Sequence, residues 1–281
     1  MKAILNLIRF PNLLLVVLSQ ALVQACLLAS DISWSKLLDP AFLALTFSTA
    51  CIAAAGYIIN DYYDVKIDAI NKPDKMVVGK FIRRRRAMFA HLVLSFIGVA
   101  IGLWLSVPVG LINFGAVMLL WGYSAHLKKM MLVGNITIAL LSASMLLVVA
   151  VQAGILNKIT LGYAGFAFLI SLIREIIKDM EDVKGDASFD CRTLPIVAGL
   201  RHTKLVLYPL AGIFMALIVA AIVYPSTSIY FDGYMVVAVI LPTILLVIKL
   251  ARADRKRDFT YLSNLNKGIM LAGILSMLLI S

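Results

Sequence analysis

Two short stretches of the chain share one spacing of acidic residues. Residues 61–68 read DYYDVKID and residues 179–186 read DMEDVKGD, so Asp-x-x-Asp-Val-Lys-x-Asp is written twice. Ten of the fifteen acidic residues lie in or beside these stretches. In a helix, positions i, i+3 and i+7 project from one face, so the spacing predicts two helix faces with three carboxylates each. They are Asp61, Asp64 and Asp68 on the first face and Asp179, Asp182 and Asp186 on the second.

Oxygen ligands of this kind suit a hard divalent cation. Carboxylates on one face repel each other at neutral pH, so a positive charge is expected between them. Carboxylate and amide oxygens with no neighbouring His or Cys favour Mg²⁺, and we expect two such ions, one for each stretch, that clamp one diphosphate. The predicted metal ligands are Asn60, Asp64, Asp68, Asp179, Asp182 and Asp186. The alternative is two solvated helix ends in which Lys66 and Lys184 pair with the carboxylates.

Basic residues near the acidic stretches could neutralise such a diphosphate. Arg174 and Lys178 lie one helical turn apart and lead into the second stretch, and Lys128 follows Tyr123 at the end of another apolar segment. Lysine and arginine donate charge-assisted hydrogen bonds to phosphate oxygens. The four arginines at 83–86 are better explained as a membrane-topology anchor than as a phosphate contact.

The elements that must position these residues are membrane-spanning helices. Of the 281 residues, 62% are hydrophobic and 15% are charged, and the mean hydropathy is +0.97. One water-soluble core could not bury so much apolar surface, and a helix needs roughly 20 apolar residues to cross a bilayer. The sequence therefore predicts an all-α, polytopic membrane protein with about nine transmembrane helices, the first of them retained rather than removed as a signal peptide. The expected spans are 9–30, 40–60, 87–106, 108–125, 132–153, 159–178, 204–224, 232–250 and 262–280.

The distribution of basic residues predicts the orientation of these spans. Of the 26 Lys and Arg residues, 24 fall on one side of the predicted membrane, and only Lys36 and Lys158 fall on the other. By the positive-inside rule the N-terminus is cytoplasmic and the C-terminus lies outside. Both acidic stretches follow even-numbered spans, the second and the sixth, so they face the cytoplasm together and predict one shared pocket. The net charge of +11 then reflects topology in the plasma (inner) membrane, and no nucleic-acid partner is expected.

Four segments follow one another in an order that is recognisable. They are NDYYDVKID followed by NKP within 60–73, YSAHLKK at 123–129, REIIKDMEDVKGD at 174–186 and TLP at 193–195. Together they resemble the UbiA superfamily of intramembrane prenyltransferases over essentially the whole chain. The resemblance implies one domain, 1–281, in two pseudo-repeated halves (1–130 and 131–281), with nine helices around a central cavity that is capped on the cytoplasmic side. One departure is that Lys75 and Met76 stand where family members commonly have Arg and Pro.

The resemblance also implies a reaction and roles for the residues. An allylic prenyl diphosphate loses its diphosphate with help from Mg²⁺, and the resulting cation is kept from water and stabilised by aromatic faces. The catalytic residues implied are Asp61, Asp64, Asp68, Asp182 and Asp186. The diphosphate-binding residues expected are Asn71, Lys72, Lys75, Tyr123, Lys128, Arg174 and Lys178. The aromatic candidates are Tyr62, Tyr63, Tyr123 and Phe168, with packing as the alternative and commoner role of such side chains.

The acceptor is the least constrained part of this prediction. The segments REIIKDMEDVKGD and TLP look most like the branch of the superfamily that joins a geranylgeranyl group to the hydroxyl of geranylgeranylglyceryl phosphate. An aromatic acceptor, a quinone or tetrapyrrole precursor, is the alternative. A secondary transporter is a more remote one, because its charged sites would lie near the bilayer midplane and not at helix ends; a structural membrane protein would not need the repeated carboxylates. The expected partners are a prenyl diphosphate donor, a lipid-phosphate or aromatic acceptor, and membrane lipid.

Overall fold

The computed structural model describes residues 2–28, 32–71, 73, 76–223 and 228–280. Within these ranges the chain is almost entirely helical. The α-helices are α1 (Lys2–Leu7), α2 (Phe10–Leu22), α3 (Pro40–Asn71), α4 (Arg84–Leu105), α5 (Val107–Ala125), α6 (Val133–Ala153), α7 (Lys158–Ala187), α8 (Leu194–Val223), α9 (Ile229–Met235), α10 (Leu241–Arg252) and α11 (Lys256–Leu275). Short 3₁₀ or π segments continue or link them: η1 (Val23–Leu27), η2 (Trp34–Leu38), η4 (Leu127–Lys129), η5 (Val236–Ile240) and η6 (Ser276–Leu279).

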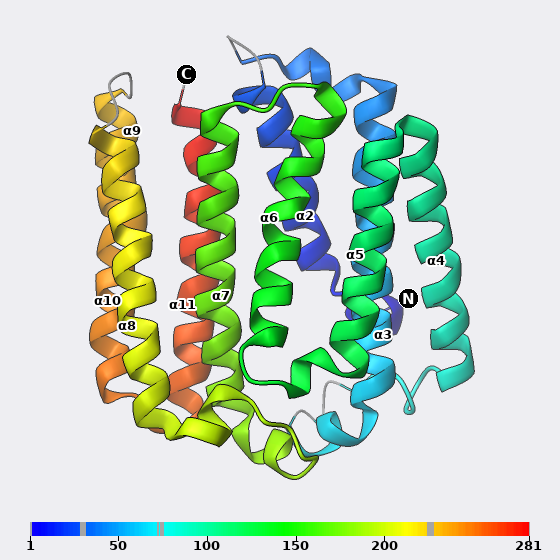
Figure 1. Cartoon of the computed structure of the whole chain (residues 1–281), viewed down its shortest axis with the longest axis vertical. Helices are drawn as coiled ribbons and strands as arrows, with labels where there is room; N and C mark the ends of the chain where they lie inside the picture. Colours follow the sequence, from blue (N-terminus) through cyan, green and yellow to red (C-terminus); the bar gives the residue numbers. More distant parts are fainter. Residues whose placement is uncertain (1, 29–31, 72, 74–75, 224–227, 281) are drawn as a thin grey trace.

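The prediction of nine membrane spans is confirmed for the described part of the chain. Nine helical stretches there are long and apolar enough to cross a bilayer, with α2 and η1 forming the first and α9, η5 and α10 together forming the eighth. Figure 1 shows these helices packed side by side as a bundle. The connections from α5 to α6, from α7 to α8 and from α10 to α11 all lie at its lower end, and the C-terminus lies at the upper end.

Several helices extend beyond the expected limits. Those limits were set where the apolar run meets charged residues, but the helices continue through the charged segments. Helices α3 and α7 run on through both acidic stretches, to Asn71 and Ala187, as the shared helical spacing predicted. Helix α11 begins at Lys256 and not at residue 262, because its first turn is charged. Helix α8 begins at Leu194 and not at residue 204, with a break at Gly199, whose φ of 80° lies in the region that glycine tolerates.

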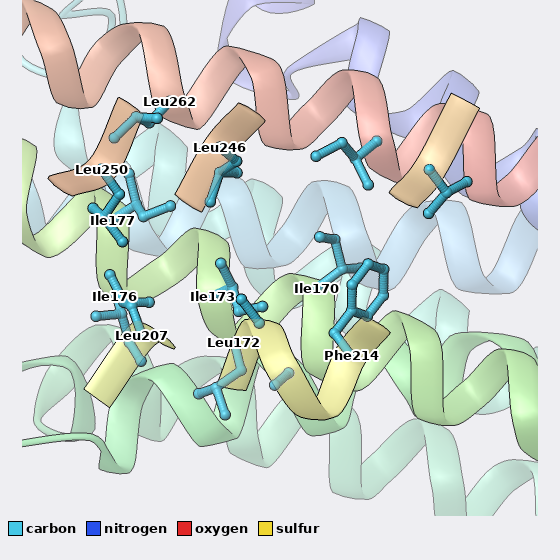
Figure 2. Close-up of a cluster of buried hydrophobic side chains, with 14 of the residues drawn as sticks. Ile170, Leu172, Ile173, Ile176, Ile177, Leu207, Phe214, Leu246, Leu250 and Leu262 are labelled. Carbon is cyan, nitrogen blue, oxygen red and sulfur yellow. The ribbon is translucent and has the colours of Figure 1, made fainter. Parts of the chain in front are cut away.

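Three packed clusters of apolar side chains lie among the described residues and hold the bundle together. The largest joins α7, α8, α10 and α11, and Figure 2 shows Ile176 of α7 beside Leu207 of α8, and Ile177 of α7 beside Leu250 of α10. Lipid tails are as apolar as these side chains, so close van der Waals packing, more than escape from water, stabilises their contact.

Buried polar groups fix the other side of the bundle. The amide of Asn113 in α5 donates to Ser48 Oγ in α3 at 2.7 Å and to the carbonyl of Gly98 in α4 at 3.0 Å. Interhelical hydrogen bonds of this kind are a recurring source of stability inside membranes. Helix α3, which carries the first acidic stretch, is therefore held against α4 and α5.

Candidate active site

Both acidic stretches open into one cavity of about 1010 Å³ between the helices. The predicted site residues that line it are Asn60, Asp61, Asp64, Asp68, Tyr123, Lys128, Arg174, Lys178, Asp179, Asp182 and Asp186. Three predicted diphosphate contacts cannot be placed: Lys72 and Lys75 lie outside the described residues, as does the side chain of Asn71. The shared pocket expected from the even-numbered spans is thus present.

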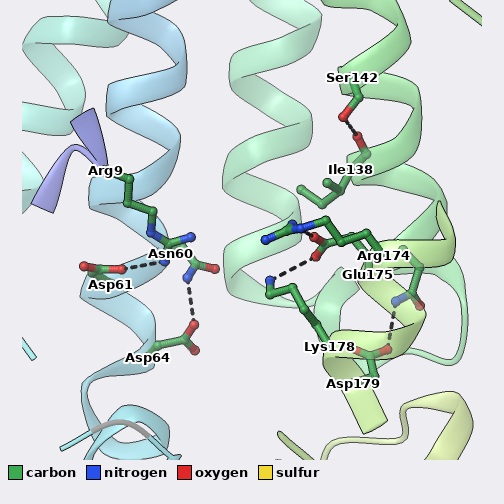
Figure 3. Close-up of polar contacts among 11 residues, drawn as sticks. Arg9, Asn60, Asp61, Asp64, Ile138, Ser142, Arg174, Glu175, Lys178 and Asp179 are labelled. Carbon is green, nitrogen blue, oxygen red and sulfur yellow. Dashed lines mark hydrogen bonds and ion pairs between the residues drawn. The ribbon is translucent and has the colours of Figure 1, made fainter. Parts of the chain in front are cut away.

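The first carboxylate cluster, on α3, is already surrounded by donors. Asp61 Oδ1 accepts from Arg9 Nη2 at 3.1 Å, and Asp64 Oδ2 accepts from Asn60 Nδ2 at 2.9 Å. The other oxygen of Asp64 pairs with the ammonium of Lys128, with both side chains largely buried. Figure 3 shows Arg9, Asn60 and Asp61 converging on this side of the site. The positive charge expected between the carboxylates comes from Lys128, in η4 between α5 and α6, and from Arg9, the N-cap of α2.

The second cluster, on α7, is built around a buried acid. Glu175 is only 6% exposed and accepts from Arg174 Nη1 at 2.7 Å and from Lys178 Nζ at 3.2 Å. One turn further, Asp179 Oδ2 accepts from Asn135 Nδ2 of α6 at 2.8 Å. Figure 3 shows these groups opposite those of α3. The two cations predicted to bind diphosphate are therefore held by a carboxylate of their own helix while they line the cavity.

Comparison with known proteins identifies the architecture. Residues 17–266 match the UbiA prenyltransferase family. The chain belongs to this family. It is 36% identical over 202 residues to the digeranylgeranylglyceryl phosphate synthase of Pyrococcus horikoshii, which covers 72% of this chain and 69% of that protein. Alignments with other archaeal proteins of the same name span between 54% and 88% of the relatives' length.

Solved structures share the fold of this UbiA family member. A digeranylgeranylglyceryl phosphate synthase studied in membranes superposes with a TM-score of 0.72 at 24% identity, over 99% of this chain and 97% of that one. A UbiA homologue from Archaeoglobus fulgidus bound to GPP and Mg²⁺ gives 0.71 at 19% identity, over 98% and 99%. The chain is therefore an integral membrane prenyltransferase of the UbiA type.

Three residues of this UbiA site were not predicted as site residues. Arg9 was explained only as a topology signal, yet it joins Asp61 and lies 4.9 Å from the ring centroid of Tyr57. Burial alone would lower the pKa of Arg9, but attraction to Asp61, with smaller contributions from Tyr57 and Asp68, raises its pKa overall, so it remains a cation. No sequence signal marks it. Glu175 did carry a signal, because an acid inside an apolar span is functional by default. The third residue, Asn135, lies in no motif or charged stretch of the sequence that would mark it as a site residue.

Most of the aromatic candidates pack away from the cavity, which is the alternative that the sequence left open for them. Of the four, only Tyr123 lines the cavity. Tyr62 instead packs under the Arg84 guanidinium, 4.5 Å from the ring centroid, and Tyr63 accepts from Trp121 Nε1 at 3.3 Å. They fall on another face of α3 than the carboxylates, and Phe168 packs on the apolar cluster of α7. The other aromatic residues along the cavity wall are Tyr57, Tyr163, Phe166 and Phe214.

A close backbone contact positions Lys128. It lies in η4, between α5 and α6, and a Cβ added at Gly134 of α6 would stand 2.7 Å from the Lys128 Cα. Only glycine allows this approach. The backbone N–H of Arg192 also donates to the carbonyl of Lys129 at 2.7 Å, which ties this turn to the loop after α7.

The donor set fits Mg²⁺ rather than a metal held by protein alone. Among the described residues, no group of three or more His, Cys, Asp or Glu side chains converges on one metal position. Mg²⁺ typically binds through one or two carboxylates and keeps sites for water and substrate phosphate. Carboxylates on two facing helices, with the amide of Asn60 beside Asp64, provide such partial shells.

Proposed function

We propose that this UbiA enzyme transfers a geranylgeranyl group from its diphosphate to the hydroxyl of geranylgeranylglyceryl phosphate. The observation that carries the proposal is that two facing carboxylate clusters and five cations of the described residues line one cavity inside a membrane bundle. The name of the relative from Pyrococcus horikoshii supports the acceptor. In the reaction, the bond between the prenyl C1 and the diphosphate oxygen breaks and diphosphate leaves with the bonding electrons, the acceptor oxygen bonds to C1, and the hydroxyl proton passes to water.

The chain's own residues divide the work between charge and shape. Lys128, Arg174 and Lys178 leave their carboxylate partners in part to donate hydrogen bonds to the diphosphate, which stabilises charge as it develops on the leaving group. Bound Mg²⁺ supplies further stabilisation of that charge. We place one ion at Asn60, Asp64 and Asp68 and a second at Asp179, Asp182 and Asp186, as the two-fold pattern suggests.

The apolar part of the cavity suits the prenyl tail. Leu141, Met145 and Ile170 line it deeper in the bundle, away from the carboxylates. Such walls exclude water from an allylic cation, and the rings of Tyr123 and Phe166 offer faces that can stabilise it.

We further infer the orientation from charge. With the basic loops in the cytoplasm, the carboxylate clusters and the N-terminus face the cytoplasm, and the C-terminus lies outside the plasma (inner) membrane. The division into halves 1–130 and 131–281, each supplying one carboxylate cluster, remains part of this proposal.

The test is an acceptor panel. Purified protein, Mg²⁺ and labelled geranylgeranyl diphosphate are incubated with geranylgeranylglyceryl phosphate, 4-hydroxybenzoate or 1,4-dihydroxy-2-naphthoate. A labelled dialkyl ether phosphate is expected, and EDTA should abolish it together with diphosphate release. If label enters only a ring acceptor, the ether-lipid assignment is wrong, and metal-dependent prenyl transfer stands.

A further inference from the structure

A second pocket, of about 370 Å³, lies between the ends of α8 and α10 at the same end of the bundle as the carboxylate clusters. Its walls are formed by Leu200, Arg201, Lys204, Leu205, Tyr208, Ala251 and Asp254. None of these residues lines the large cavity. The pocket is therefore separate from the large cavity.

The floor of the pocket carries a lysine that is held in place by weak partners. The Lys204 side chain is 12% exposed, and its ammonium donates to the carbonyl of Ala251 at 3.3 Å and to Asp254 Oδ1 at 3.1 Å. Asp254 is 79% exposed, and ion pairs to such exposed carboxylates contribute little stability. An anion that enters the pocket can displace Asp254 and receive the same ammonium donor.

Further positive charge surrounds this lysine. Arg201 lies one helical turn before Lys204 on the same wall and is exposed. Lys249 and Arg252 occupy the last turn of α10, and Arg255, three residues further on, is the N-cap of α11. Asp254 is the acid of the pocket wall, and Asp258, nearby, is engaged by the backbone N–H of Arg255 at 3.0 Å. The balance at this end of α8 and α10 therefore favours a negatively charged ligand.

The pocket is also apolar on the side that faces lipid. Leu205, in its wall, is 56% exposed, and Ile248 of α10, one turn away from Ala251, is 54% exposed. Large exposed apolar side chains on a membrane-spanning bundle contact acyl chains. A ligand here would meet cations at the membrane interface and hydrocarbon just below them.

We propose that this pocket binds the phosphate headgroup of an anionic phospholipid, with Lys204 and Arg201 as its donors. Basic pockets between spanning helices at the membrane interface have the chemistry to hold such headgroups. The bound lipid would bridge α8 and α10 at their charged ends and so stabilise the outer layer of the bundle.

The test measures binding apart from catalysis. Detergent-solubilised protein is titrated with phosphatidylglycerol, with phosphatidylcholine or with inorganic phosphate, while the thermal midpoint and the lipid retained in native mass spectra are recorded. Phosphatidylglycerol should raise the midpoint saturably, and the pair Arg201→Ala/Lys204→Ala should need about tenfold more lipid for the same shift. The matched pair Arg85→Ala/Arg86→Ala removes the same charge from α4 and should leave the titration unchanged.

Three results would overturn the proposal. One is an equal loss in both double variants, which would mean that overall charge binds the lipid. Another is stabilisation by phosphatidylcholine, or by inorganic phosphate, as strong as that by phosphatidylglycerol. The third is an unchanged lipid titration in both single variants, Arg201→Ala and Lys204→Gln. Each is measured on samples whose lipid-free thermal midpoints match that of the parent protein.

Discussion

Replacing Lys128 by methionine should separate substrate binding from stability. The ammonium pairs with Asp64, and the side chains of the two residues are 12% and 13% exposed. A hydrogen bond to a charged group contributes about 1.5–3 kcal/mol, and each 1.4 kcal/mol is about tenfold in affinity. If Lys128 moves from Asp64 to the diphosphate when the donor binds, Lys128→Met should raise the KM for the prenyl diphosphate about 10- to 100-fold.

The same substitution should also cost stability, which the sequence alone did not suggest. Lys128 is nearly enclosed, and its loss leaves Asp64, among the described residues, with the Asn60 amide as its hydrogen-bond donor at 2.9 Å. Because the cavity is large enough to admit water, we expect a loss of about 1–3 kcal/mol rather than the larger cost of a sealed site. Removing both charges in Asp64→Asn/Lys128→Met should restore most of that stability without restoring activity.

The assay is steady-state diphosphate release with purified protein, alongside thermal unfolding in the same detergent. Lys129→Met is the matched control, because Lys129 is adjacent in sequence but exposed, and its kinetics should stay near those of the parent. A donor KM that is unchanged in Lys128→Met would refute the role in diphosphate binding. An equal rise in Lys129→Met would point to loss of general surface charge instead.

Three further outcomes are expected. Asp64→Asn and Asp182→Asn should each lower turnover about 100- to 1,000-fold in folded protein, because each removes an ionised oxygen donor from a different cluster; near-normal turnover in either would exclude that cluster from the reaction. Gly134→Ala should raise the donor KM and lower the thermal midpoint, since its Cβ would meet the Lys128 backbone at 2.7 Å, whereas Gly162→Ala, with nothing within 4 Å, should change neither. In a cell-based labelling assay, Cys introduced at Lys158 should react from outside and Cys at Arg84 only from inside, because the basic loops are expected in the cytoplasm. The native cysteines are buried and should contribute little label. The opposite result would reverse the proposed topology.

The sequence predicted those parts of the site that repeat along one helix. Asp61, Asp64 and Asp68 line one cavity because a single uninterrupted helix, α3, carries all three, and hydropathy with periodicity is enough to predict such a helix. Contacts between distant segments leave no such trace. Arg9 and Asp61 are separated by 52 positions, and no period of either helix relates them. The left-handed backbone of Arg9, with φ of 50°, separates α1 from α2 and is equally invisible in composition.

The charges along the cavity suggest why metal and donor should bind together. Among the described residues of its lining, eight carboxylates stand against five cations, Lys267 of α11 included. With every group ionised, that part of the wall is net negative, and a diphosphate would be repelled unless cations accompany it. The carboxylates, in turn, would repel each other without the lysines and arginines that now pair with them. Divalent ions that arrive with the diphosphate would satisfy the carboxylates and free Lys128 and Lys178 for the phosphate oxygens, so the exchange of partners favours both ligands at once.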